Sequence, residues 1–174
     1  MNHSNPIPAS RIAFVQACWH KEIVDQCRLS FTSEISRLGF PPGEVDFFEV
    51  PGVFEIPLQA QLLAKSGRYA CIVTTGFVVD GGIYRHEFVS EAVISGLMRV
   101  QLDTEVPVIS AVLTPQRFHE HEDDRAFFLA HFRIKGREAA EACAKTIGNL
   151  TREPALRNKH AAGVSTAAGV QLRR

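Results

Sequence analysis

The segment Val50–Pro57 places a Pro-Gly turn, an aromatic side chain and a carboxylate directly before an amphipathic run. Gly52 allows a positive φ or a close approach of the backbone to a ligand. Phe54 and Glu55 then open a helix whose first N–H groups have no partner within the helix. This combination predicts a binding site. The alternative is an ordinary strand–turn–helix corner in which Glu55 caps the helix.

The segment Gly76–Val89 also runs from an apolar strand through glycines into a helix. Gly81, Gly82 and Ile83 at a helix start predict a phosphate site, because free N–H groups and the positive end of the helix dipole favour an anion. A glycine pair alone more often marks a plain turn. Two basic residues, Arg85 and His86, follow. A guanidinium anchors phosphate but stays protonated, whereas an imidazole exchanges a proton near neutral pH.

Together the two segments resemble lumazine synthase, the family that catalyses the penultimate step of riboflavin biosynthesis. The resemblance extends from about Arg11 to about Leu150, with the motifs in the order and at the spacing of the family. It implies condensation of 5-amino-6-(D-ribitylamino)uracil with 3,4-dihydroxy-2-butanone 4-phosphate to 6,7-dimethyl-8-ribityllumazine, with release of phosphate and water. No cofactor is implied, so the enzyme would mainly position its two substrates.

The resemblance also assigns roles to individual residues. Trp19, the only tryptophan, would stack on the pyrimidine ring with its large flat surface. The alternative is that Trp19 fills the core. Glu55 would bind the hydroxyl groups of the ribityl chain. The other contacts of the pyrimidine and its ribityl chain would come from Val53, Phe54, Val78, Val79, Asp80 and the main chain of Ser110.

One departure from the family pattern concerns the proposed catalytic residues. Most members carry hydroxylated residues after the glycines and then a histidine, whereas this chain has Ile83, Tyr84, Arg85 and His86. An ungapped match puts Arg85 in the place of the acid–base histidine. Neighbouring residues on a helix diverge by about 100°, so the two side chains would not face the site equally. The Arg85-His86 pair resembles the second type of lumazine synthase, whose members form decamers of two pentamers.

The resemblance implies that a neighbouring subunit completes the site. Lys135 matches a lysine shortly before the final helix, and Arg125 or His131 would hold the phosphate, with Arg125 favoured because a guanidinium binds phosphate in bidentate fashion. A polar cluster nearby also suggests zinc, but its spacing fits no recognised ligand pattern, so a solvated turn and no metal are expected. That cluster consists of His119, His121, Asp123 and Asp124.

Alternating apolar and amphipathic segments predict the elements that hold these residues. Strands are expected at Arg11–Ala17, Val45–Val50, Tyr69–Val79 and Val106–Leu113. Helices are expected at about His20–Leu38, Phe54–Lys65, Tyr84–Leu102, Arg125–Ala130 and Gly136–Leu150. Such alternation predicts an α/β fold, a flavodoxin-like three-layer sandwich with a four-stranded parallel sheet flanked by helices. Ligands of such sheets bind beyond the carboxyl ends of the strands, so the motifs are expected to converge there.

Composition agrees with a single domain. The 174 residues are 45% hydrophobic and carry 19 basic and 19 acidic side chains, so no overall charge indicates nucleic acid or an anionic membrane as a partner. No apolar run is long enough for a membrane span and residues 1–10 do not resemble a signal peptide, so a cytoplasmic location is expected. Four cysteines lack metal or redox spacing and are expected to be reduced thiols with no shared role. They are Cys18, Cys27, Cys71 and Cys143.

The chain is therefore expected to comprise an N-terminal arm (1–10), a lumazine synthase domain (11–150) and a flexible C-terminal tail (151–174). The resemblance implies a homopentamer or a decamer of two pentamers that acts on small molecules. The alternative is a non-catalytic flavin- or lumazine-binding protein on the same scaffold, because ring binding needs only Trp19 and the segment around Glu55.

Overall fold

The computed structural model describes residues 11–83, 85–119 and 121–152. Four strands form one parallel sheet: β1 (Arg11–Ala17), β2 (Val45–Val50), β3 (Tyr69–Phe77) and β4 (Val108–Leu113). Their order is β2-β1-β3-β4, so β2 and β4 are the edges. This is the expected flavodoxin-like arrangement, in which the direction of strand progression reverses between β1 and β3.

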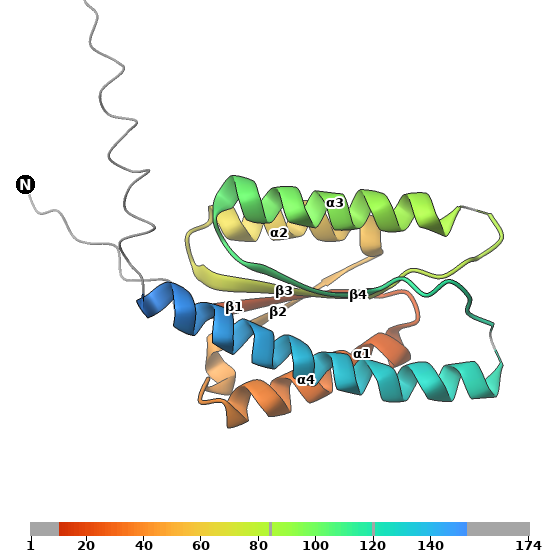
Figure 1. The fold of residues 1–174 in the computed structure, drawn as a ribbon, viewed down its shortest axis with the longest axis horizontal. Coiled ribbons are helices and arrows are strands. Elements are labelled where there is room, and N and C mark those ends of the chain that lie inside the picture. The colour runs from red at the N-terminus through yellow and green to blue at the C-terminus, as the bar shows by residue number, and fades with distance from the viewer. Residues whose placement is uncertain (1–10, 84, 120, 153–174) are drawn as a thin grey trace, which may run out of the picture.

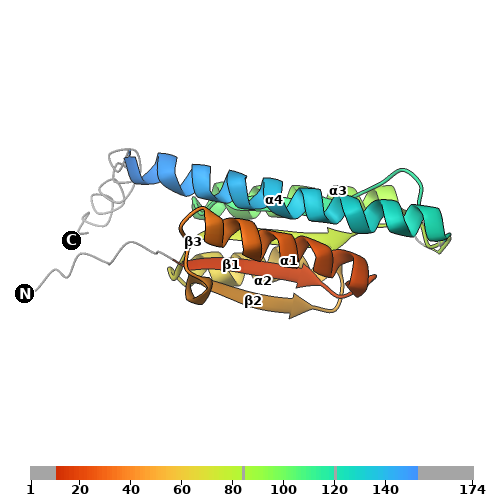
Figure 2. The ribbon, with the colours of Figure 1, turned by 90° about the horizontal axis from the view of Figure 1, so that it is seen from below.

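Four α-helices cover the two faces of the sheet, as Figures 1 and 2 show. They are α1 (Lys21–Arg37), α2 (Ile56–Lys65), α3 (His86–Thr104) and α4 (Glu122–Arg152). Helices α1 and α4 lie on one face, and α2 and α3 on the other. Alternate residues of β1 point to opposite faces, so Phe14 packs beneath α1 and α4 while Val15 packs beneath α2 and α3. The three-layer α/β prediction is confirmed.

The last helix differs from the prediction of two helical stretches. Residues 122–152 form one continuous helix, α4. Gly136 does not mark a boundary: it lies at the point where α4 touches α1. A Cβ at position 136 would lie 2.0 Å from Ser30 Oγ and 2.3 Å from the carbonyl oxygen of Cys27. The glycine is therefore required by the closeness of the two helices.

Other boundaries also differ from the prediction, among them the end of β3, which is Phe77 instead of Val79. A short 3₁₀ turn, η2 (Val53–Glu55), precedes α2, which begins at Ile56 instead of Phe54. Helix α3 begins at His86 instead of about Tyr84, because Gly82 takes a positive φ of 73° and the chain turns there. Strand β4 begins at Val108, after Pro107, which has no N–H to donate to a neighbouring strand.

The amino ends of the strands are joined by a polar cluster far from the predicted site. Arg11 Nε donates to Asp46 Oδ2 at 2.8 Å, and the Tyr69 hydroxyl donates to the same oxygen at 2.9 Å. The hydrogen bonds from Arg11, followed by the one from Tyr69, lower the pKa of the Asp46 carboxyl. This cluster joins β1, β2 and β3 at their amino ends, opposite the carboxyl ends at which the predicted site lies.

All four cysteines are free thiols, as predicted. Two of them are nevertheless neighbours in the core, which the sequence did not indicate. The thiol of Cys143 on α4 contacts that of Cys71 on β3, and this contact together with burial raises the pKa of Cys71. Burial also raises the pKa of Cys27 to about 11.

Two expectations for the chain ends lie outside the described residues. These are the arm over residues 1–10 and, except for Thr151 and Arg152 at the end of α4, the tail over 151–174. Within the described ranges, each helix is too short or too polar to span a lipid bilayer.

Candidate functional site

The predicted motifs meet at the carboxyl end of the sheet. The loop after β1 carries Trp19, the loop after β2 carries Gly52 and Glu55, and the loop after β3 carries Asp80. Figure 2 shows the strand arrowheads pointing toward the end where α4 begins. The strand order reverses between β1 and β3, where sheets of this kind bind their ligands.

Trp19 lies on the surface at this edge. Its side chain is 63% exposed, so the alternative that it fills the core is wrong. The preceding residue is fixed by a hydrogen bond from Cys18 N to the Val50 carbonyl at 3.0 Å. A Cβ at position 52 would lie 4.0 Å from Trp19 Nε1, so the indole lies over the Pro-Gly turn. An exposed aromatic surface at a strand end offers a flat platform for a planar ligand.

The turn after β2 brings Glu55 back onto Gly52. Glu55 Oε2 accepts a hydrogen bond from Gly52 N at 2.9 Å, so the capping role considered as the alternative is present. The other oxygen, Oε1, makes no hydrogen bond within the described part of the chain and faces an exposed surface. Phe54 is also exposed, whereas Val53 is buried against Gly76. Glu55 therefore combines a structural hydrogen bond with a free acceptor, and Val53 offers only its backbone to a ligand.

The loop after β3 forms a hollow of about 560 Å³. Asp80 Oδ1 accepts from Gly82 N at 2.9 Å and so fixes the glycine turn. Val78 is buried, and its N–H donates to the Leu113 carbonyl at 2.9 Å, which leaves Val79 as the first free N–H of this loop. The hollow is lined by Asp80, Gly82, Ile83, Arg85, His86, Glu87 and Phe88.

Arg85 and His86 both line this hollow, contrary to the argument from helical divergence. Arg85 is the N-cap of α3, with an extended backbone (φ −70°, ψ 103°), and is not inside the helix. Its exposed guanidinium lies over the Phe88 ring, 5.6 Å from the ring centre. The His86 side chain is only 13% exposed, with Nδ1 3.7 Å from Glu87 Oε2. The glycine turn and the first turn of α3 thus form two sides of one hollow, with an exposed guanidinium and a largely buried imidazole.

Ser110 and Lys135 are not brought to this site within one chain. Ser110 is exposed on β4, three residues before the strand ends, which corresponds to about 10 Å along the strand. Lys135 lies 13 residues into α4, about 20 Å along the helix from the end near the loops. Its ammonium group pairs with Glu138 at 2.7 Å. The expectation that Lys135 precedes the final helix is wrong, because α4 is continuous.

The two candidates for the phosphate clamp lie on different parts of α4. Arg125 forms an ion pair with Glu22 on α1, so its guanidinium is engaged within the chain. His131 is half-buried and its ring stacks on Phe127, with centroids 5.5 Å apart. Phe127, His131 and Lys135 are spaced four residues apart, so they share one face of the helix.

The polar turn before α4 does not gather metal ligands. Within the described ranges no group of three or more His, Cys, Asp or Glu side chains is arranged to hold a metal ion. Asp124 Oδ2 instead accepts from the backbone N–H of His119 at 3.0 Å.

His20 is a residue near the site to which the sequence assigned no role. It takes a left-handed conformation directly after Trp19. The single hint in the sequence is that histidine is among the few non-glycine residues that tolerate this conformation. Its ring contacts Phe77 and Phe118, which are distant in sequence, so pattern analysis had no means of detecting the contact.

Comparison with known proteins shows the family of this chain. Residues 9–151 match the family model described as 6,7-dimethyl-8-ribityllumazine synthase. A protein of that name from Rhodococcus erythropolis is 60% identical over 148 residues, which cover 85% of this chain and 96% of the relative. Proteins named 6,7-dimethyl-8-ribityllumazine synthase 2 are similar too. The one from Pseudomonas syringae pv. tomato is 57% identical over 82% of this chain and 84% of its own length, and the one from Bradyrhizobium diazoefficiens is 56% identical over 95% and 97%.

A family match over most of the chain, relatives of more than half identity, and a site at the expected edge of the expected sheet lead to one conclusion. The chain belongs to the 6,7-dimethyl-8-ribityllumazine synthase family.

Proposed function

We propose that this chain condenses 5-amino-6-(D-ribitylamino)uracil with 3,4-dihydroxy-2-butanone 4-phosphate at the carboxyl end of its sheet. The observation that carries the proposal is the pairing of two features at that edge. An exposed tryptophan lies above a turn with a free carboxylate oxygen, and the next loop encloses a hollow lined by a glycine turn and two basic side chains. The first suits a planar ring with a polyol chain, and the second suits a phosphate.

The chemistry is divided between the two features. The pyrimidine ring stacks on Trp19, and a ribityl hydroxyl donates to Glu55 Oε1. The phosphate lies against the Gly81–Ile83 turn and the first N–H groups of α3, with Arg85 as its counter-charge. Holding both substrates in one place removes most of the entropy cost of their encounter, which is the main contribution available to a site without a cofactor.

His86 is the stronger candidate for proton transfer. Arg85 stays protonated at neutral pH and so serves best as an anchor. His86 lies on the same hollow, is partly buried and is held at the helix start. The choice of His86 is supported by the position of Arg85 outside the helix, which allows the two side chains to line one hollow.

We also propose that Ser110, His131 and Lys135 serve the site of a neighbouring subunit. Ser110 and Lys135 lie about 10 and 20 Å short of the loops of their own chain, as described above. His131 shares the helix face of Lys135, whereas Arg125 is paired with Glu22. This favours His131 over Arg125 as the phosphate clamp supplied from outside.

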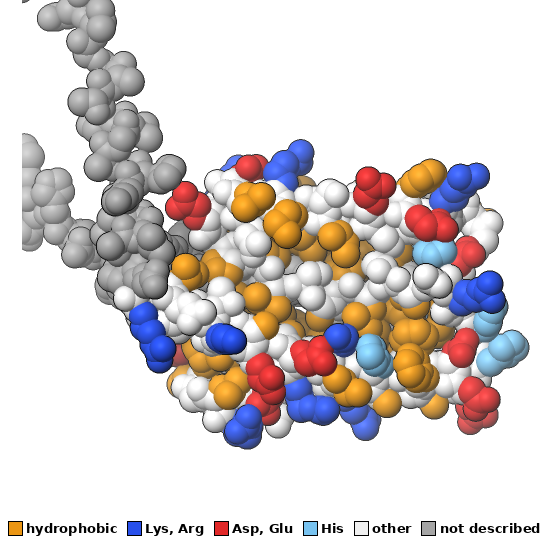
Figure 3. Space-filling view, in the orientation of Figure 1, with side chains coloured by type: hydrophobic (Ala, Val, Ile, Leu, Met, Phe, Trp, Pro, Cys, Tyr) orange, Lys and Arg blue, Asp and Glu red, His pale blue; other side chains and the backbone are white. Residues whose placement is uncertain are grey.

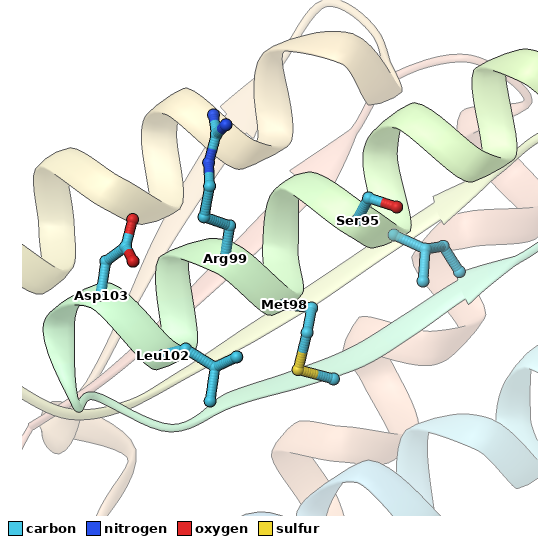
Figure 4. A pocket seen from close by; sticks show the side chains of 6 residues that line it. Ser95, Met98, Arg99, Leu102 and Asp103 are labelled. Atoms are coloured by element: carbon cyan, nitrogen blue, oxygen red, sulfur yellow. The ribbon is translucent and has the colours of Figure 1, made fainter.

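The surface around β4 fits such an assembly. β4 is an edge strand, and an open edge beside apolar surface is a common place for association. Figure 3 shows apolar side chains gathered across the face formed by α3, β4 and α4. On α3 the exposed apolar residues Ile94, Met98 and Leu102 recur at intervals of four, and they border a hollow of about 450 Å³ (Figure 4). A pentamer, or a pair of pentamers, would repeat this contact around a closed ring.

A complementation experiment tests the shared site. Arg85→Ala and Lys135→Ala chains are co-expressed with different tags, and the mixed oligomers are assayed for lumazine formation. At a butanone phosphate concentration well below the raised KM of Arg85→Ala, each variant alone should show little activity. The mixture should recover activity because some sites combine an intact Arg85 with an intact Lys135 from the neighbour.

The matched control is a mixture of Arg85→Ala and Trp19→Ala chains, since both substitutions fall in the same half of the site and no combination restores it. Equal activity in the two mixtures, or a fully active wild-type monomer by light scattering, would refute the shared site.

Flavin binding measured on the wild-type protein separates an enzyme from a non-catalytic flavin-binding protein, which would bind flavin and form no lumazine. We place the enzyme in the cytoplasm, with its small-molecule substrates.

A further inference from the structure

His20 has an unusual backbone conformation. Its dihedral angles, φ 50° and ψ 43°, lie in the left-handed region, and within the described ranges Glu105 is the only other non-glycine residue with a positive φ. A side chain with a Cβ disfavours this region, so the conformation persists only where the surroundings hold it.

The His20 ring is held between two phenylalanines. It makes edge-to-face contacts with Phe77 at the end of β3, at 5.7 Å between ring centroids, and with Phe118 before α4, at 5.3 Å. The two phenylalanines contact each other at 5.0 Å, and both contact Phe128 on α4. The ring is thus wedged into an aromatic cluster that joins β3, the loop before α4, and α4 itself.

The backbone of His20 is fixed as well. Its carbonyl oxygen accepts from Ile23 N at 2.9 Å and Val24 N at 3.1 Å, which begins α1. On the other side of Trp19, Cys18 N donates to the Val50 carbonyl at 3.0 Å. Trp19 therefore lies between two anchored residues, while 63% of its own side chain is exposed and little else restrains it.

We propose that His20 is a positioning residue for Trp19. By holding a left-handed turn in place, its ring sets the direction in which the indole leaves the backbone and keeps it over Gly52. Loss of the ring leaves the turn free to relax, and the indole must then be ordered when the substrate binds. This inference rests on the proposed function, in which Trp19 stacks on the pyrimidine.

The single tryptophan makes this directly measurable, because all tryptophan fluorescence of the chain comes from Trp19. His20→Asn and His20→Gly keep access to the left-handed region and remove the ring. His20→Phe keeps an aromatic ring and removes its nitrogen atoms. Phe128→Leu is the matched control, because it weakens the same aromatic cluster without removing a contact that His20 makes.

We expect lower fluorescence anisotropy and stronger acrylamide quenching for His20→Asn and His20→Gly in the assembled protein without substrate. Their KM for the ribitylamino-pyrimidine should rise by about 2- to 10-fold with little change in kcat, the factor that corresponds to ordering one side chain on binding. His20→Phe should restore both the tryptophan fluorescence properties and the KM to their wild-type values. Phe128→Leu should lower the stability of the protein without changing the fluorescence properties or the KM.

Unchanged anisotropy in both ring-deleted variants would overturn the positioning role, as would an equal change in Phe128→Leu. If His20→Phe restored the anisotropy but not the KM, the imidazole would be in direct contact with the substrate. That outcome would also overturn the positioning role. A fall in anisotropy with an unchanged KM would leave the positioning intact and refute the stacking role of Trp19 in the proposed function.

Discussion

Gly136→Ala is the substitution whose effect the structure specifies most closely. A Cβ at this position would lie 2.0 Å from Ser30 Oγ, 2.3 Å from the Cys27 carbonyl oxygen and 3.0 Å from Phe31 N. The hydroxyl of Ser30 has freedom to rotate away, but the other two atoms belong to the backbone of α1. Relief therefore requires α4 to move away from α1 by about 1 Å, since ordinary contacts of this kind are about 3.5 Å.

Two opposing effects set the magnitude. Alanine is favoured over glycine inside a helix by about 1 kcal/mol. Forcing apart a packed interface costs about 1–3 kcal/mol and occasionally more, and here the clash involves backbone on one side. Because the clash is with backbone, we take the cost at the upper end of that range, about 3 kcal/mol, which leaves a net loss of roughly 2 kcal/mol in the free energy of unfolding.

Gly148→Ala is the matched control in the same helix. A Cβ there meets no atom within 4 Å, so only the helix preference of alanine remains and stability should rise by up to about 1 kcal/mol. Urea unfolding at one fixed protein concentration measures both, since assembly makes stability depend on concentration. A Gly136→Ala variant as stable as Gly148→Ala would show that α4 does not pack against α1 as described.

Two further predictions concern the site and the core. Arg85→Ala should mainly raise the KM for the butanone phosphate, whereas His86→Ala should lower kcat by roughly 10²-fold. A kcat that His86→Ala leaves unchanged would return proton transfer to Arg85 or to the neighbouring subunit. The Cys27 thiol, with a folded-state pKa of about 11 against an ordinary value of 9.0, favours the folded state below pH 9, and this contribution is lost as the pH rises through 11. Between pH 9 and pH 11 the free energy of unfolding of Cys27→Ala should therefore fall by roughly 2–3 kcal/mol less than that of the wild type. Urea unfolding at a series of pH values measures this difference. An equal fall in both proteins would show that the thiol is not buried.

Sequence patterns sufficed for the sheet because its strands are short, apolar and separated by strong turn signals. The Pro-Gly turn and the paired glycines also located the loops that carry Glu55 and Arg85. The helix boundaries were harder to predict from sequence patterns. Whether Gly136 begins a helix or lies in a close contact within one depends on Ser30, which is over a hundred residues away in sequence.

The geometry of Arg85 and His86 depends on a backbone detail of the same kind. One residue of difference in where α3 begins decides whether the two side chains diverge or share a hollow. The position of His20 depends on rings from β3 and from the loop before α4, and no local pattern encodes it. Local propensity thus predicted the elements, while contacts between distant segments decided the site.

The place of α4 at the end of the fold has a consequence for the order in which the chain acquires its structure during synthesis. α4 covers one face of the sheet together with α1, where Phe132 joins Phe14 and Phe31, and Arg133 donates to Gln26 across 107 positions of sequence. Strands β1 to β4 and the first three helices are made before any of α4. At typical translation speeds its 31 residues take roughly 2–6 seconds to add, and for that time the phenylalanines of this face lack their cover. The emerging chain therefore passes through a stage in which α1 alone covers this face of the sheet, and this is the stage at which chaperones would be expected to bind it.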